Sequence, residues 1–192
     1  MFKIKFNNII LISNKTKVTN SKVVLFFYGL GCSSNDLKFF FKRVKFKSQL
    51  LIVELPGHNH VKSNNYDLMI FARNMYLFLK KNKINEITFF AHSLGGIIPI
   101  LLVKYFLKKK YFIKNFINYE GNLTKYDTAN LTKKTVSYNK KEFIYEKFKQ
   151  LINKCRHSDQ QYLNSWSKSL LKTSSTAFYD LSKQCVKLSE SN

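Results

Sequence analysis

The stretch Ile87–Gly96, with the sequence ITFFAHSLGG, is the part of the sequence that decides which fold is predicted. An apolar run typical of a buried strand leads into a small-x-Ser-x-Gly-Gly turn, and an apolar helical pattern follows it. Such a sharp strand-to-helix turn lifts the hydroxyl of Ser93 clear of a sheet, and crowding there requires small neighbours, here Ala91 and Gly95. A serine hydroxyl is a weak nucleophile unless a base takes its proton, and helix N–H groups stabilise developing negative charge. The stretch therefore predicts a nucleophilic serine at one edge of a sheet.

Short β-rich runs alternate with helical patterns on both sides of this turn, which is typical of a mainly parallel α/β sheet. The expected strands are Phe2–Phe6, Ile9–Ser13, Val23–Tyr28, Gln49–Leu55, Glu86–Ala91 and Asn115–Tyr119. The helices expected between them run from Ser34 or Asn35 to about Arg43, over Tyr66–Asn82 and over Ile97–Lys110. A length of 192 residues suits one domain with a small appendage.

The pattern changes after Tyr119. Residues 123–138 are polar and predict a loop. Three amphipathic helical patterns follow, at Lys141–Cys155, Tyr162–Leu170 and Thr176–Leu188. No further strand is predicted, so we expect an α/β core over residues 1–122 and an inserted helical cap segment over residues 123–192.

Two further segments accompany the serine turn in chain order. Residues 28–31 (YGLG) follow the third expected strand, and residues 54–59 (ELPGHN) follow the fourth. With residues 91–96 (AHSLGG), they resemble the oxyanion loop H-G-x-G, the turn D-x-P-G-H-G and the nucleophile elbow of the α/β-hydrolase family. Tyr28 stands where the family has histidine, and Glu54 stands where it has aspartate. The three ordered motifs and the helices between them extend the resemblance over residues 1–125, and EGNL at 120–123 also recurs in some capped members.

This resemblance implies a serine hydrolase that acts on a carboxylic ester or thioester through an acyl-enzyme. Ser93 would be the nucleophile, and the backbone N–H groups of Leu30 and Leu94 would form the oxyanion hole. The resemblance implies no cofactor and no metal. The Phe- and Leu-rich helical segment favours a small apolar acyl substrate.

The acid and the base of such a site stay open at this point. The family order is serine, then the acid, then histidine; the acid usually follows the seventh strand and the histidine follows the eighth. The chain ends at Asn192 before a seventh strand is predicted, so we expect a C-terminally truncated hydrolase, and a degenerate one without turnover is an alternative. Glu120 follows the sixth strand, where a few members place the acid, and His157 is the histidine that comes after Ser93. Without later strands, Asn115–Tyr119 would be an exposed sheet edge through which the chain self-associates.

Plainer interpretations stand beside these assignments. Ser93 can serve as a helix cap, and Leu30 can be an ordinary turn residue. His92 is expected to be a packing residue under the site. His58 and His60 are expected to be loop residues, because no carboxylate or cysteine accompanies them at metal-ligand spacing.

The charge allows another function class, a protein that binds nucleic acid or an anionic membrane. The formal net charge is +22, from 33 basic and 11 acidic residues. The charge is spread over the whole chain, however, and arginine, the residue preferred for bidentate phosphate and base contacts, is scarce. Lys, Asn, Ile, Phe and Tyr are abundant together, which is typical of an A/T-rich genome. Codon bias is therefore the favoured explanation of the charge, over a polyanion partner.

Composition also bears on location. Cys32, Cys155 and Cys185 lack paired spacing and are expected to be reduced thiols in a cytoplasmic protein. The longest uncharged run, Ile87–Val103, falls short of the ~20 residues that span a bilayer. We therefore expect no transmembrane segment.

Overall fold

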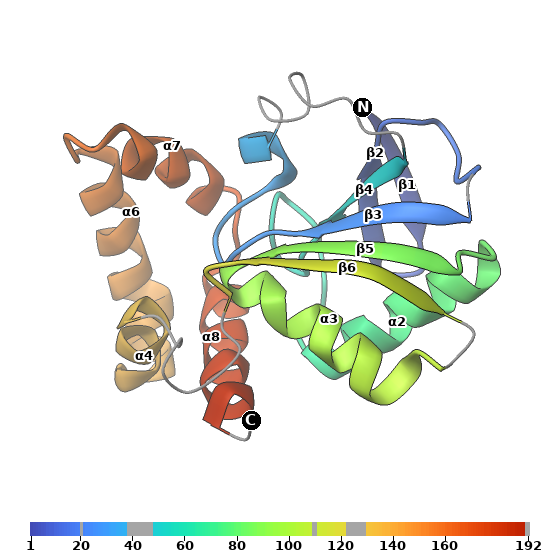
Figure 1. The fold of residues 1–192 in the computed structure, drawn as a ribbon. Coiled ribbons are helices and arrows are strands. Elements are labelled where there is room, and N and C mark those ends of the chain that lie inside the picture. The colour runs from blue at the N-terminus through green and yellow to red at the C-terminus, as the bar shows by residue number, and fades with distance from the viewer. Residues whose placement is uncertain (20, 38–47, 109–110, 122–129, 191–192) are drawn as a thin grey trace.

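The computed structural model describes residues 1–19, 21–37, 48–108, 111–121 and 130–190. A six-stranded sheet in the order β1-β2-β4-β3-β5-β6 forms its centre (Figure 1). The strands are β1 (Phe2–Phe6), β2 (Ile9–Ser13), β3 (Lys22–Phe27), β4 (Gln49–Glu54), β5 (Glu86–His92) and β6 (Phe112–Tyr119). β2 pairs antiparallel with β1 and β4, and the other pairs are parallel. The predicted α/β class with a mainly parallel sheet is confirmed.

The parallel register brings the carboxyl ends of three strands to one edge of the sheet. Phe27 at the end of β3 pairs with Ala91 of β5. His92, the last residue of β5, pairs with Tyr119, the last residue of β6. Ligand sites of open α/β sheets form outside these carboxyl ends, so this edge is where a site is expected.

Two helical segments cover one face of the sheet (Figure 1). They are α2 (Leu68–Lys81) and α3 (Ile97–Leu101), which continues as the π-helical turn η3 (Leu102–Phe106). α2 begins two residues later than expected, because the Asp67 carboxylate accepts hydrogen bonds from the N–H groups of Met69 and Ile70 and caps the helix there. The helix expected over Ile97–Lys110 ends earlier, at Phe106, where the Leu107 N–H bonds to the Leu102 carbonyl.

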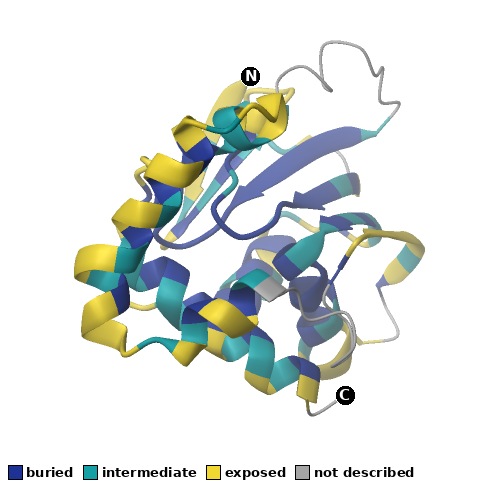
Figure 2. Cartoon of the chain, turned by 90° about the vertical axis from the view of Figure 1, so that its left-hand side faces the viewer, coloured by how far each residue is buried: buried dark blue, intermediate teal, exposed yellow. Residues whose placement is uncertain are grey.

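The helices after the sheet lie beyond the carboxyl ends of the parallel strands (Figure 1). They are α4 (Asn130–Ser137), α5 (Lys140–Glu142), the π-helical turn η4 (Phe143–Lys147), α6 (Phe148–Arg156), α7 (Gln161–Leu170) and α8 (Ser175–Glu190). Figure 2 shows buried residues on the inward sides of these helices and exposed residues on their outer sides. The three amphipathic helical patterns expected after residue 138 are therefore confirmed.

Three local expectations need correction or fall outside the described residues. The loop expected over residues 123–138 is wrong in its second half, which forms α4. Its inward face contains the buried Thr132 and Thr135, so this helix lacks the apolar stripe that marks the others. β6 begins at Phe112, three residues earlier than expected, and a register irregularity opposite Ile87/Thr88 separates its first residues from the stretch that was expected. Of the helix expected from Ser34 to Arg43, the described part is the short 3-10 turn η1 (Ser34–Leu37), and residues 38–47 lie outside the described chain.

α8 joins the apolar core of the sheet. Phe178, Leu181 and Cys185 are fully buried within that core. The side chain of Gln184 accepts a hydrogen bond from Leu68 N–H and donates one to the Tyr66 carbonyl, both at 2.8 Å. These contacts attach α8 to the start of α2.

We predict that Phe178→Ala lowers the free energy of unfolding by about 3–5 kcal/mol, because it leaves a cavity beside the rings of Phe143 and Phe148. Urea unfolding followed by circular dichroism measures this change. The matched control is Tyr145→Ala, which removes an aromatic ring that is 81% exposed and changes stability by less than about 0.5 kcal/mol. Equal effects of the two substitutions would contradict the packing described for α8.

Candidate functional site

Ser93 occupies the turn between β5 and the short 3-10 turn η2 (Ser93–Gly96). Its φ of 51° lies in the left-handed region, which is uncommon for a residue other than glycine and concentrates at functional sites. A Cβ at Gly95 would lie 2.5 Å from the Phe27 carbonyl oxygen and 2.7 Å from that of Tyr28. Glycine is therefore required at position 95, because the turn packs directly on the main chain at the end of β3.

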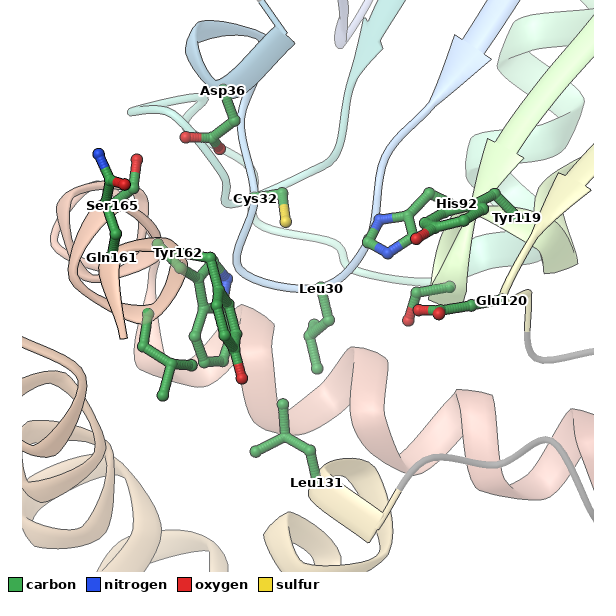
Figure 3. A pocket seen from close by; sticks show the side chains of 14 residues that line it. Leu30, Cys32, Asp36, His92, Tyr119, Glu120, Leu131, Gln161, Tyr162 and Ser165 are labelled. Carbon is green, nitrogen blue, oxygen red and sulfur yellow. The ribbon is translucent and has the colours of Figure 1, made fainter. Parts of the chain in front are cut away.

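A cavity of about 970 Å³ opens in front of this turn. Figure 3 shows His92, Tyr119 and Glu120 on one wall, with Gln161, Tyr162 and Ser165 on the opposite wall. Leu30 and Leu131 lie between them in this view. Strand ends, loops and helices all contribute to the lining: Gly29, Leu30, Cys32, Asp36, His92, Ser93, Tyr119, Glu120, Leu131, Gln161, Tyr162, Leu163, Ser165 and Trp166.

The structure brings some of the residues that the sequence singled out together at this cavity. Ser93, Leu30 and Glu120 all line it, and Leu94 follows Ser93 as a buried residue. Glu120 directly follows β6 and has a left-handed φ of 49°. His157 lies at the carboxyl end of α6, is exposed, and is not among the described residues that line the cavity.

The loop that carries Leu30 is held by a buried histidine. His58 Nε2 accepts a hydrogen bond of 2.9 Å from the N–H of Gly31, the residue after Leu30. Its Nδ1, 3.1 Å from the Pro56 carbonyl, is then the protonated nitrogen and donates to that oxygen. Burial lowers the pKa of His58 to about 4, although the Pro56 carbonyl acts in the opposite direction. His58 is thus a neutral positioning residue, a role that the sequence analysis missed when it treated His58 as an ordinary loop residue.

A buried carboxylate lies behind the same loop. Glu54 is 1% exposed and accepts hydrogen bonds from the Tyr28 hydroxyl at 2.5 Å, from the Asn59 amide at 2.8 Å and from Ser34. The Tyr28 oxygen accepts in turn from the Leu55 N–H at 2.9 Å. Burial, and next the charge of Glu54, raise the pKa of Tyr28 well above its ordinary value, so it stays a donor. Tyr28 and Glu54, the two residues that depart from the family pattern, are therefore hydrogen-bonded to each other.

Asp36 and Cys32 are site residues that the sequence analysis did not identify. Asp36 accepts from the Ser33 N–H at 2.7 Å and from the Ser169 hydroxyl at 2.7 Å, which joins the loop after β3 to α7. Burial, and then the nearby Asp36 carboxylate, raise the pKa of Cys32 to about 12. A thiol that stays protonated at neutral pH is a poor nucleophile, so Ser93 has no competitor in Cys32.

His92 lines the cavity beside Ser93 and is half-buried. Burial lowers its pKa below the ordinary 6.5, and the carboxylate of Glu120 acts in the opposite direction. The imidazole is therefore mostly neutral at pH 7, with a carboxylate nearby. Among the described residues, no group of three or more His, Cys, Asp or Glu side chains is arranged to hold a metal ion.

Solved structures of other proteins are similar to this chain in fold. A carboxylesterase of Nitrososphaera gargenis is similar over 95% of this chain and 70% of its own, with a TM-score of 0.67 and 15% identity. MenH of S. aureus matches over 92% and 69% of the two chains, with a TM-score of 0.66 and 15% identity. A bromoperoxidase of Bacillus anthracis matches over 91% and 68%, with a TM-score of 0.69 and 12% identity. No protein-family model and no curated protein matches the sequence.

Such low identities show a shared fold and nothing finer. The chain spans about 70% of the length of the Nitrososphaera gargenis carboxylesterase. Within the described residues, no helix has the length and apolar character needed to cross a bilayer.

The buried His58 predicts a pH dependence of stability. Its pKa is about 4 in the folded protein and 6.5 ordinarily, so the unfolded chain binds the proton more tightly. The contribution of the neutral His58 to the free energy of unfolding is complete above pH 6.5. Roughly 3 kcal/mol of it is lost as the pH falls toward 4. We expect the stability difference between the wild type and His58→Gln to narrow over this range in urea unfolding. The exposed His60→Gln serves as the control and should follow the wild type, whereas a constant difference for His58→Gln would contradict the assignment.

Proposed function

Because the chain has the α/β-hydrolase fold, we propose that it is a serine hydrolase that acts on a carboxylic ester or thioester through an acyl-enzyme at Ser93. The observation that carries this proposal is the left-handed backbone of Ser93 at the mouth of the cavity, on a turn packed against the end of β3. Strain of this kind is retained where a reactive side chain has to be presented.

The proposed reaction has two halves. The Ser93 oxygen attacks the carbonyl carbon, and the N–H groups of Leu30 and Leu94 stabilise the oxyanion that forms. The alcohol or thiol leaves, and water then hydrolyses the acyl-enzyme. His58 supports the first half by holding the Gly31 N–H, which keeps the loop of Leu30 in place.

The proposed substrate is a small apolar acyl compound. The helical side of the cavity presents Leu131 from α4 and Tyr162, Leu163 and Trp166 from α7. These groups contact an acyl chain favourably because they remove apolar surface from water. We also propose a division into a core over residues 1–122 and a helical cap segment over residues 123–192. The side chains of α4 and α7 that line the cavity at the strand ends support it, whereas α8 of the same segment packs into the core.

We further propose that the chain self-associates through β6. In the described part of the chain, β6 pairs with β5 alone and lies at the edge of the sheet. Phe112, Phe116, Ile117 and Tyr119 are each more than 40% exposed along it. An exposed apolar edge with free main-chain groups favours pairing with another strand.

Sedimentation velocity tests the edge proposal. We expect concentration-dependent association that strengthens with salt, because salt screens the repulsion between chains of net charge +22. Ile117→Lys, which places a charge on the edge, should reduce association. Tyr145→Lys, which places the same charge on the exposed η4, should leave it unchanged. A wild-type chain that stays monomeric at high salt would exclude this mode of association.

A fluorophosphonate probe tests the nucleophile. We expect mass spectrometry to find the phosphonyl group on Ser93, because Ser93 lines the cavity and the N–H groups of Leu30 and Leu94 are the proposed oxyanion hole. Ser93→Ala should lose both the label and ester hydrolysis above background, and Ser137→Ala, a change at an exposed serine of α4, should keep both. Labelling of another serine that is unaffected by Ser93→Ala would remove the proposed function.

A further inference from the structure

A second hollow lies in the helical segment, between α4 and the helical stretch formed by η4 and α6. Its volume is about 400 Å³, which is within the range of sites for small molecules. Lys134, Lys147 and Lys154 line it, and no acidic side chain is among the described residues that do. We call it the lysine hollow. A cleft lined by charge of one sign attracts the opposite charge, so this hollow favours an anionic ligand.

Helical spacing brings these side chains to one place. Leu131 and Lys134 lie three residues apart on α4, and Lys147, Leu151 and Lys154 follow one another at intervals of four and three residues over η4 and α6. Residues three and four apart share one face of a helix. Each of the two helical stretches therefore turns a face with both leucine and lysine toward the hollow.

The floor of the lysine hollow is apolar and fixed in place. Phe143 is 3% exposed and packs against the rings of Phe148 and Phe178, at centroid distances of 5.9 and 5.8 Å. The Tyr138 ring stacks on Phe143 at 6.4 Å, and the Tyr138 carbonyl accepts a hydrogen bond of 3.1 Å from the Tyr179 hydroxyl. Phe178 and Tyr179 belong to α8, which attaches the floor to the core. A buried apolar floor beside exposed lysines suits a ligand with an apolar body and an anionic end.

Two of the three lysines are left to bind such a ligand. Lys147 Nζ lies 2.9 Å from Glu146 Oε1 and 3.3 Å from Glu142 Oε1, so its charge is already balanced. Lys134 and Lys154 are exposed, and neither forms an ion pair with any residue that the structure describes. Two cations that line one hollow repel each other, and an anion bound by both removes that repulsion.

The lysine hollow adjoins the main cavity at Leu131. This side chain lines both spaces. Figure 3 shows it at the start of α4, pointing toward Leu30. A ligand whose chain passes over Leu131 can therefore reach Ser93 at one end and the lysines at the other.

We propose that the lysine hollow binds the far, anionic end of the substrate. This inference rests on the proposed function. The apolar acyl compound proposed above then carries a carboxylate or a phosphate at the end of its chain. Lys134 and Lys154 bind that anion, and the chain contacts Leu131 and Leu151. The substrate class is thus an ester or thioester whose acyl chain is apolar along its length and anionic at its end, with the chain length matched to the separation between the lysines and Ser93.

Calorimetry with three ligands of equal chain length tests the hollow directly: octanoate, octyl phosphate and the neutral octan-1-ol. We expect both anions to bind about 10-fold more tightly than the alcohol. Tighter binding of octanoate assigns a carboxylate to the end of the substrate, and tighter binding of octyl phosphate assigns a phosphate. Equal affinities for the anions and the alcohol overturn the inference.

Single substitutions locate the bound anion. Lys134→Gln and Lys154→Gln should each weaken anion binding by about 3- to 5-fold and leave binding of octan-1-ol unchanged, because each removes one exposed charge. Lys149→Gln removes a charge from α6 outside the hollow, so this matched control should bind like the wild type. Equal weakening by all three substitutions would assign the binding to the net charge of +22 and overturn the inference.

Labelling of Ser93 tests whether the lysine hollow and the main cavity hold one molecule. Two fluorophosphonates of equal chain length are compared over several lengths, one ending in a carboxylate and the other in a methyl group. We expect the carboxylate probe to label Ser93 faster at one length, by about 10-fold. The double substitution of Lys134→Gln with Lys154→Gln should remove this preference and leave labelling by the methyl-ended probe unchanged.

The outcomes separate the inference from the function on which it rests. Equal labelling rates for the two probes at every length, or a preference that the double substitution keeps, overturn the inference and leave the nucleophile intact. Failure of both probes to label Ser93 removes the proposed function and this substrate with it. Anion binding that calorimetry still finds would then mark the lysine hollow as a ligand site separate from any reaction at Ser93.

Discussion

The close packing of the serine turn on the end of β3 is the constraint on which the site depends. Gly95 lies so near the carbonyl oxygens of Phe27 and Tyr28 that no side chain fits there. This contact brings the end of β5 against the start of the loop after β3, and Ser93 is held there in a left-handed conformation. Interiors pack at the density of organic crystals, so a turn of this kind has one arrangement rather than a range.

The loop after β3 is kept in place by polar groups removed from water. The buried Glu54 carboxylate accepts hydrogen bonds from Tyr28, Ser34 and Asn59, and His58 accepts one from Gly31. A buried charge without partners costs several kcal/mol, whereas one with complete hydrogen bonding holds its surroundings in a single geometry. Among the described residues, no buried side-chain polar atom lacks a partner. The loop after β3 is therefore built on a satisfied network, which holds its backbone N–H groups in one geometry.

The helices after the sheet have two roles. α8 belongs to the common apolar core, since Phe178 and Leu181 are fully buried there. α7 borders the cavity and is joined to the loop after β3 through the hydrogen bond between Ser169 and Asp36. The helical segment thus both stabilises the sheet and shapes the cavity, so it is more than an appendage on a complete core.

The sequence by itself determined the six strands, the serine turn and the amphipathic helices after residue 138, because period and turn chemistry are local properties of the chain. It also singled out Ser93 through the crowding that a strand-to-helix turn requires, and Leu30 through the resemblance to the α/β-hydrolase family. It missed α4, whose buried face is made of threonines, and it did not assign roles to His58 or Asp36. Those roles come from partners far away in the chain, such as Gly31 for His58 and Ser169 for Asp36, which only the tertiary structure brings within hydrogen-bond distance. The grouping of His92 with Glu120 likewise depended on the register of β5 and β6, and no local pattern encodes that register.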